Sequence, residues 1–167
     1  MNTNNGTSLA PQLGQLLIGR GWMFSCAESC TGGLLAAAMT ETAGSSQWFD
    51  RGFVTYSNAA KVEQLLVNED TLERFGAVSE ETAMEMAAGV LTTTRQSSLA
   101  ISVTGIAGPG GATPGKPVGM VCFGFAQRTS QGVTTRAVTH IFDGDRATIR
   151  RAAVEFALHT AIELIEL

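Results

Sequence analysis

Apolar residues recur with the spacing of amphipathic helices in two long segments of the chain. In the first, leucines at helical spacing predict a helix that ends at Arg20 and Gly21. In the second, Ser79 can cap a helix that has Glu80 and Glu81 in its first turn, where the helix dipole favours acidic residues. The apolar residues of the two segments are Leu9, Leu13, Leu16 and Leu17, and Ala83, Met86, Ala87, Val90 and Leu91. Each predicted helix therefore has one apolar face that another layer must cover.

Other segments have the alternation or the β-favouring content of strands. Residues 99–104 carry a large apolar side chain at every second position, which predicts a strand. Residues 118–127 and 133–142 are joined by a short loop that contains Gly132, and they predict an antiparallel hairpin. Two further strands are expected, at residues 22–26 and within 49–57. A hairpin near the end of the chain means that the sheet is mixed rather than all parallel.

Helical segments separate these strands. Short helices are expected at residues 34–39 and 70–74, and Asn58 is the predicted N-cap of a helix over 59–67. The last helix is expected to point Ile149, Ala152, Ala153, Phe156, Ala157 and Leu164 inward and Arg150, Arg151 and Glu155 outward. Strands separated by helices, with a hairpin near the end, predict a three-layer α/β/α fold around a mixed sheet.

The length and composition fit one compact domain. Of the 167 residues, 44 % are hydrophobic and 16 % are charged, against roughly 25 % charged residues in typical soluble domains. We expect a single domain over residues 8–167, preceded by a polar, disordered segment at 1–7. Eleven Lys and Arg against fifteen Asp and Glu leave a net charge of −4, and no basic cluster stands out. Nucleic acid is therefore not an expected partner.

The cysteines and the apolar stretches indicate where in the cell the protein is located. Cys26, Cys30 and Cys122 are odd in number and contain no CxxC pair, which favours reduced thiols over a disulfide framework or a zinc site. The longest nearly apolar stretch, residues 118–126, is shorter than the about 20 residues of a membrane span. The first residues lack the features of a signal peptide. We therefore expect a cytoplasmic protein with no membrane association and no metal.

Glycine is over-represented, with 19 of 167 residues, against an average near 7 %. Two glycine-bearing loops, at residues 27–33 and 105–111, directly follow predicted strands. Ligands of open α/β sheets bind at the carboxyl ends of strands, so both loops are candidate walls of a site. Thr31, Gly32 and Gly33 open a helix, whose free N–H groups can hold an anion or an oxyanion. The alternative is that these glycines serve only turns and the packing of a helix on the sheet.

One glycine pattern is misleading. Residues 110–117 nearly match a phosphate-binding P-loop. However, Pro117 stands where a Ser or Thr would bind Mg²⁺, and a strand follows where a helix should. An ATPase is therefore not predicted, and Lys116 is expected to be a solvated loop residue rather than a phosphate ligand.

Ser29 and Cys30 stand at the tip of a predicted strand, just before a helix N-terminus, where N–H groups can stabilise an oxyanion. A serine nucleophile needs a base, yet neither His140 nor His159 has the spacing of a triad. Lys61 lies in the first turn of a predicted helix, where the dipole disfavours the ammonium form. Its pKa would have to fall from about 10.4 to about 7.5, which also requires burial or a cationic neighbour. From spacing alone, two nucleophiles remain open: the hydroxyl of Ser29, with Lys61 as its base, and the thiol of Cys30.

The motifs that carry a family resemblance are spread along the whole chain. They are residues 27–33, 44–49, 52–58 with Lys61, 76–79, 105–109, 116–119 and 144–146. In this order they resemble the C-terminal domain family of the competence/damage-inducible protein CinA, and in particular its stand-alone nicotinamide-nucleotide amidohydrolases. The resemblance extends from about Leu9 to the end of the last helix.

This resemblance implies hydrolysis of the carboxamide of nicotinamide mononucleotide (NMN) to nicotinate mononucleotide and ammonia, without a cofactor or metal. Such an enzyme serves pyridine nucleotide recycling. The resemblance also implies Ser29 as the nucleophile, Lys61 as the base and Tyr56 as the residue that relays or orients the proton. Substrate contacts are expected from Cys30, Thr31, Gly32, Gly33, Gly105, Ala107, Gly108 and Arg146, the last of these from its charge.

Alternatives remain at the level of the sequence. The chain could be a catalytically silent nucleotide-binding or competence-related paralog, or an amidase for another small carboxamide. Arg146 could be a surface residue at the start of a helix. Members of the family commonly form homodimers or larger homo-oligomers, and Trp48 or Phe49 could belong to such an interface.

Overall fold

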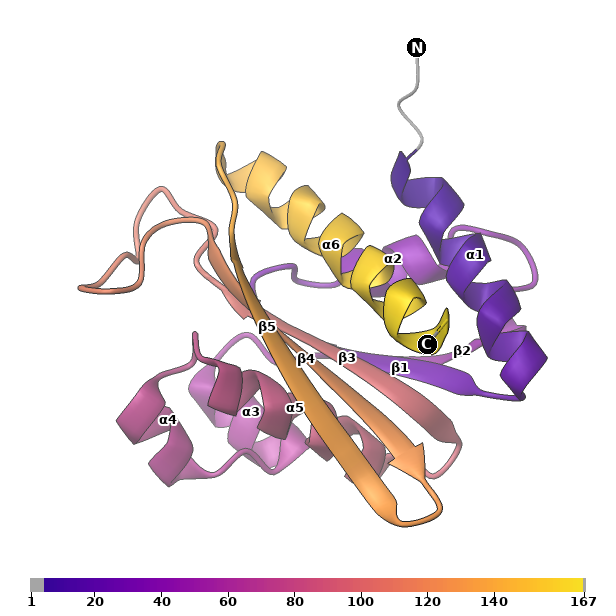
Figure 1. Cartoon of the computed structure of the whole chain (residues 1–167). Coiled ribbons are helices and arrows are strands. Elements are labelled where there is room, and N and C mark those ends of the chain that lie inside the picture. Colours follow the sequence, from indigo (N-terminus) through magenta and orange to yellow (C-terminus); the bar gives the residue numbers. More distant parts are fainter. Residues whose placement is uncertain (1–4, 167) are drawn as a thin grey trace.

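The computed structural model describes residues 5–166, which form a sheet between two layers of helices (Figure 1). The strands are β1 (Met23–Glu28), β2 (Phe49–Val54), β3 (Ser97–Gly105), β4 (Met120–Thr129) and β5 (Gly132–Ile141). The helices are α1 (Asn5–Arg20), α2 (Leu34–Thr40), α3 (Asn58–Leu65), α4 (Glu69–Phe75), α5 (Glu80–Thr93) and α6 (Arg146–Glu166), with a short 3₁₀ turn, η1 (Ser45–Gln47). One face of the sheet is covered by α1, α2 and α6, and the other by α3, α4 and α5. The predicted α/β/α fold with a mixed sheet is confirmed.

The strand order β2-β1-β3-β4-β5 brings the parallel strands together on one side of the sheet. The central strand β1 runs parallel to both β2 and β3, whereas β4 is antiparallel to β3 and to β5. In the β1–β2 pair, Phe24 lies opposite Phe49 and Ser25 lies opposite Arg51, so β2 contains one extra residue, Asp50. The carboxyl ends of β1, β2 and β3 therefore share one edge, where a ligand site is expected.

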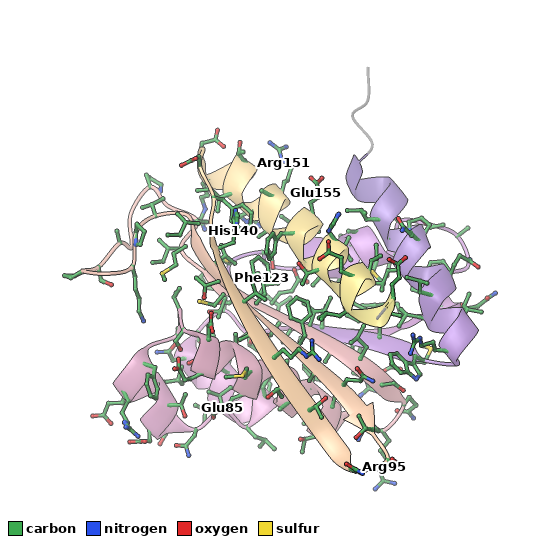
Figure 2. All side chains as sticks on the ribbon, in the orientation of Figure 1. Glu85, Arg95, Phe123, His140, Arg151 and Glu155 are labelled. Carbon is green, nitrogen blue, oxygen red and sulfur yellow. The ribbon has the colours of Figure 1, made fainter. Side chains whose placement is uncertain are left out.

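Two apolar clusters fill the space between the layers. The larger lies under α1, α2 and α6, and it includes Phe123, whose ring centroid is 4.7 Å from that of Phe156. Figure 2 places Phe123 between the sheet and α6. The smaller cluster lies under α5 and includes Met86 and Val90. Both faces of the sheet are thus packed, and no helix among residues 5–166 has the length and apolar character needed to cross a membrane.

Trp48 belongs to the core and not to a surface. Its side chain is 3 % exposed, its Nε1 donates to the carbonyl oxygen of Met39, and its ring lies against Gly14. The expectation that Trp48 contributes to a subunit interface is therefore wrong, because the tryptophan is already covered within its own chain. Phe49 is half-buried and packs against the same core, and its place in an interface stays a prediction.

Several element boundaries differ from those predicted. The first helix, α1, packs on α6 and begins at Asn5. Residues 5–7 of the polar segment are therefore helical rather than disordered. Residues 1–4 of that expected segment lie outside the described residues. The N-cap of α3 is Ser57, whose side chain accepts from the amide of Ala60, and not Asn58. Ser79 caps α5 as predicted, through the amide of Thr82.

The contact between α5 and α3 leads to a prediction about stability. A Cβ at Gly89 of α5 would overlap the carbonyl oxygen of Leu65 at the end of α3. We expect Gly89→Ala to lower the free energy of unfolding by about 1–3 kcal/mol, although alanine is the better helix former, because the two backbones must separate. The matched control is Gly19→Ala in α1, where nothing lies within 4 Å of the new methyl group. There we expect a gain of about 0.5 kcal/mol. Denaturant unfolding measures both, and a loss of equal size in the two variants would contradict the packing argument.

Candidate active site

Ser29 follows directly on the central strand β1, at the edge where the parallel strands end. Its amide donates to the carbonyl oxygen of Val103 in β3 at 2.9 Å, and its own carbonyl accepts from the amide of Gly32 at 3.1 Å. The residue is 8 % exposed. Both backbone groups of Ser29 are therefore fixed, and its hydroxyl is presented from a rigid position.

Lys61 reaches Ser29 from the first turn of α3. Its side chain is 1 % exposed, and its Nζ lies 3.0 Å from Ser29 Oγ. The same nitrogen donates to the carbonyl oxygens of Thr55 at 2.8 Å and Tyr56 at 3.2 Å. Because β2 lies beside β1, the loop that follows β2 delivers these two carbonyls next to Ser29. The structure thus brings together Ser29 and Lys61, which are 32 residues apart in the sequence.

The environment of Lys61 makes its ammonium group easier to deprotonate. Burial lowers the pKa of Lys61 from 10.5 to about 8, because the ammonium ion loses its hydration in the protein interior. A neutral amine has two N–H donors and one lone pair. In the structure Nζ donates to Ser29 Oγ, and the Ser29 hydroxyl donates to the carbonyl oxygen of Tyr56 at 3.4 Å. When the amine is neutral, the two carbonyl oxygens can accept both of its N–H groups, and its lone pair is left for the proton of the Ser29 hydroxyl, as a general base requires.

Tyr56 takes part through its backbone and, separately, through its side chain. Its carbonyl oxygen accepts from Lys61, whereas its ring is 62 % exposed and its hydroxyl accepts from Arg146 Nη2 at 3.2 Å. Arg146 also donates from Nη1 to the carbonyl oxygen of Gly108 at 2.8 Å. Arg146 therefore connects the tyrosine on one side of the site to the glycine loop on the other.

A cleft of about 300 Å³ opens above Ser29. Its lining includes eight of the residues expected at the site, namely Ser29, Cys30, Tyr56, Lys61, Gly105, Ala107, Gly108 and Arg146. The remaining lining residues are Ala77, Val78, Thr104, Ile106, Gly110 and Gly111, so the lining contains two cationic side chains and no carboxylate. This arrangement suits a small, anionic ligand.

Three residues expected at the site lie outside the lining of the cleft. Thr31, Gly32 and Gly33 form the turn that leads from Ser29 into α2. The glycines have positive φ values of 55° and 110°, which a residue with a side chain rarely adopts. The turn is held on one side by Glu28, whose buried carboxylate accepts from two amides at the start of α2. These three residues therefore shape the segment that carries Ser29.

Arg150 is a residue of this region that the sequence pattern misplaces. It was expected to face outward on α6, but it is half-buried, and its guanidinium donates to the carbonyl oxygens of Cys30 at 3.0 Å and Thr31 at 3.3 Å. An arginine beside a turn need not face solvent, because guanidinium donors can be satisfied by carbonyl oxygens as well as by water. A signal was present, because Arg146 and Arg150 are four residues apart and so share one face of the helix.

The remaining nucleophile and base candidates are less suited to the chemistry. Burial raises the pKa of the Cys30 thiol to about 11, so the reactive thiolate is disfavoured. His140 and His159 are exposed, and neither lines the cleft. Lys116 donates to the carbonyl oxygen of Phe75 outside the cleft lining. Within residues 5–166, no three His, Cys, Asp or Glu side chains are grouped as metal ligands.

The buried amine of Lys61 predicts a pH dependence of stability. Its pKa is about 8 in the folded protein against an ordinary value of 10.5, so between these values the unfolded chain binds more protons. The stability contributed by this group therefore rises with pH through that window, and below pH 8 the cost of burying the ammonium ion is fully present. We expect the free energy of unfolding of the wild type, measured relative to Lys61→Met, to rise by about 2 kcal/mol between pH 7.5 and pH 10.

Urea unfolding of both proteins at the two pH values measures this difference. The matched control is Lys116→Met, which removes a lysine outside the cleft. If the difference in free energy of unfolding between the wild type and Lys61→Met is the same at both pH values, the prediction is contradicted.

Comparison with known proteins identifies the family. The model of the CinA C-terminal domain matches residues 6–165. Curated relatives named nicotinamide-nucleotide amidohydrolase PncC are 53 % identical over 154 residues in Enterobacter agglomerans and 50 % identical over 152 residues in Escherichia coli strain K12. The alignments cover 92 % of this chain and 92 % of the first relative, and 91 % of this chain and 90 % of the second.

Solved structures agree with this assignment. The competence damage-inducible protein A (ComA) of Klebsiella pneumoniae subsp. pneumoniae MGH 78578 superposes with a TM-score of 0.90 at 39 % identity, covering 96 % of each chain. The competence/damage inducible protein CihA of Agrobacterium tumefaciens superposes with a TM-score of 0.88 at 45 % identity, covering 98 % of each chain. The chain belongs to the CinA C-terminal domain family.

Proposed function

We propose that this chain is a nicotinamide-nucleotide amidohydrolase, which hydrolyses the carboxamide of NMN to nicotinate mononucleotide and ammonia. The names of its relatives at 50 % and 53 % identity support the activity and the substrate. The observation that carries the proposal is the buried Lys61 amine, 3.0 Å from the Ser29 hydroxyl in the floor of the cleft. By the same proposal, the enzyme acts in pyridine nucleotide recycling in the cytoplasm.

In the first half of the reaction, the neutral amine of Lys61 accepts the proton of the Ser29 hydroxyl while Oγ attacks the carboxamide carbon. The carbonyl oxygen of the substrate becomes an oxyanion. The Lys61 ammonium then donates its proton to the departing nitrogen, the C–N bond breaks, and ammonia leaves. The product of this step is an ester between Ser29 and the nicotinoyl group.

In the second half, water replaces ammonia. Lys61, neutral again, accepts a proton from the water as its oxygen attacks the ester carbon. The ammonium ion returns this proton to Ser29 Oγ as the ester bond breaks, and nicotinate mononucleotide is released. The carbonyls of Thr55 and Tyr56 hold the amine in place in both protonation states, since an ammonium ion can donate to them as well as an amine.

The oxyanion needs donors at a fixed position. The amide of Cys30 follows the nucleophile directly, and Cys30 lines the cleft. Among residues 5–166, neither the amide of Cys30 nor that of Thr31 donates to a backbone carbonyl. Backbone donors that are held in place before the reaction stabilise the developing charge without reorganisation.

The nucleotide part of the substrate binds against the wall of the cleft opposite Ser29, which Arg146 and the glycine loop form. Arg146 uses one N–H for Gly108 and one for Tyr56, which leaves further guanidinium donors for a phosphate. The glycine loop lines this wall, and at Gly110 a Cβ would have nothing within 4 Å, so the ribose can approach the backbone closely there. We therefore assign phosphate recognition to Arg146 and ribose contacts to the glycine loop.

The nucleophile is tested by hydrolysis of NMN by the purified protein, with ammonia and nicotinate mononucleotide as the measured products. We expect Ser29→Ala to lose at least about 10³-fold in kcat, because the covalent step is abolished. Cys30→Ala should keep most of the activity, since the thiol is buried and protonated. Loss of activity in Cys30→Ala but not in Ser29→Ala would move the nucleophile to the thiol.

Calorimetry on the wild type separates the remaining alternatives. Saturable binding of NMN without product would instead indicate a silent nucleotide-binding paralog. Turnover of other carboxamides but not of NMN would indicate an amidase with another substrate.

Phosphate recognition is tested by comparing NMN with nicotinamide riboside, which lacks the phosphate. We expect Arg146→Met to raise KM for NMN about 10- to 100-fold, the equivalent of one charge-assisted hydrogen bond, and to change kcat/KM for the riboside far less. The matched control is Arg151→Met, an arginine of the same helix that does not line the cleft. An equal loss on both substrates would contradict a phosphate contact.

A further inference from the structure

The turn that carries Ser29 is held by a side chain from the far end of the chain. Arg150 of α6 lies 120 residues after Cys30, and its Nε donates to the carbonyl oxygen of that residue at 3.0 Å. Its Nη2 donates to the carbonyl oxygen of Thr31 at 3.3 Å. Within residues 5–166, no carboxylate lies within 4.0 Å of this guanidinium. The charge of Arg150 is therefore directed at the two backbone carbonyls.

These contacts connect Arg150 to the nucleophile through rigid peptide planes. The N–H and C=O of a trans peptide point in opposite directions, so fixing one fixes the other. The carbonyl of Thr31 shares a peptide with the amide of Gly32, and that amide donates to the carbonyl of Ser29 at 3.1 Å. The carbonyl of Ser29 in turn shares a peptide with the amide of Cys30. The orientation of the Cys30 amide thus depends, through two peptide planes, on the position of Arg150.

We propose that Arg150 is a positioning residue, which orients the backbone N–H groups after Ser29 toward the oxyanion of the reaction. The proposal rests on the proposed function, because it concerns the same hydrolysis. Arg150 does not line the cleft, and it acts only through the peptides of residues 29–32. A misplacement of about 1 Å in such a donor is enough to slow the chemical step strongly while leaving the bound substrate in place.

The geometry calls for an arginine in particular. A planar guanidinium offers several donors at fixed angles and can hold two carbonyl oxygens at once, whereas a lysine ammonium is a point donor on a flexible chain. The two carbonyls that Arg150 holds belong to consecutive residues, which matches the fork of the side chain.

The test compares Arg150→Met and Arg150→Lys with the control Arg151→Met. Arg151 is exposed, and Figure 2 shows it on the outer side of α6, away from the sheet. We expect Arg150→Met to lower kcat for NMN about 30-fold, less than the loss of a complete oxyanion donor, and to change KM less than about threefold. Arg150→Lys should lie between Arg150→Met and the wild type, and Arg151→Met should match the wild type.

Thermal unfolding identifies variants that fail to fold. If Arg150→Met is one of these, the kcat of Arg150→Lys decides whether the proposal holds. A folded Arg150→Met with unchanged kcat, a loss confined to KM, or an Arg150→Lys with the kcat of the wild type would each overturn the proposal.

A second measurement separates this inference from the proposed function. Phosphonylation of Ser29 by a fluorophosphonate also needs the oxyanion donors but not the pyridine nucleotide: Oγ bonds to phosphorus, fluoride leaves, and Lys61 accepts the proton. If the wild type does not hydrolyse NMN, the proposed function fails, and the rate of phosphonylation then decides the role of Arg150. A rate about tenfold lower in Arg150→Met supports that role, and an equal rate overturns it. A wild type that reacts with neither reagent overturns both.

Discussion

The amine of Lys61 is surrounded by three oxygen atoms in the interior, and the rest of the site depends on this contact. An ammonium ion there loses its hydration, and the pKa falls to about 8 because the hydrogen bonds only partly replace that hydration. Two of the oxygens are backbone carbonyls after β2, and the third is the hydroxyl of Ser29 after β1. The amine therefore requires that the two strands be adjacent, that α3 begin where it does, and that helices cover the site on both faces of the sheet.

The cleft combines segments with different tasks. The segments that follow the parallel strands β1 and β2 supply the nucleophile and the carbonyls that hold the amine, and α3 supplies the amine itself. Strand β3 leads into the glycine loop on the opposite wall. The hairpin β4–β5 takes no comparable part; it extends the sheet and brings the chain to α6. The first turns of α6 then return to the site with Arg146 at the rim and Arg150 behind the turn. Residues from both ends of the sequence thus meet at one edge of the sheet.

The sequence predicts the layers and much of the site. Period-two alternation located β3, and the glycine loops marked the edge where the strands end. The strand tip and the helix start offered Ser29, Cys30 and Lys61 as candidates, and only the family resemblance singled out Ser29 with Lys61. The prediction ascribed the lowered pKa of Lys61 partly to the helix dipole, whereas burial is the main cause. Burial of this kind depends on tertiary packing, so the local sequence cannot reveal it.

Other features of the site have no clear sequence signal. The carbonyls of Thr55 and Tyr56 hold the amine, but every residue has a carbonyl, so nothing in the sequence distinguishes these two. Arg150 was assigned to solvent because a charged residue beside other charged residues usually marks the outer face of a helix. Its partners are backbone atoms 120 and 119 residues away. Only the fold brings them within reach.

Because β2 contains an extra residue, the geometry of the site depends on how many residues this strand has, and less on which side chains they carry. Asp50 shifts the pairing of β2 with β1 by one position, and the shifted register ends with Val54 opposite Glu28 and the amide of Thr55 bonded to the carbonyl of Glu28. Removing one residue between Asp50 and Val54 would exchange the two faces of the strand. The carbonyls that hold Lys61 would then move by about 3.3 Å, the rise of one residue. Substitutions at exposed positions such as Arg51 leave this register intact, so in this strand insertions and deletions are far more damaging to the site than changes of side chain.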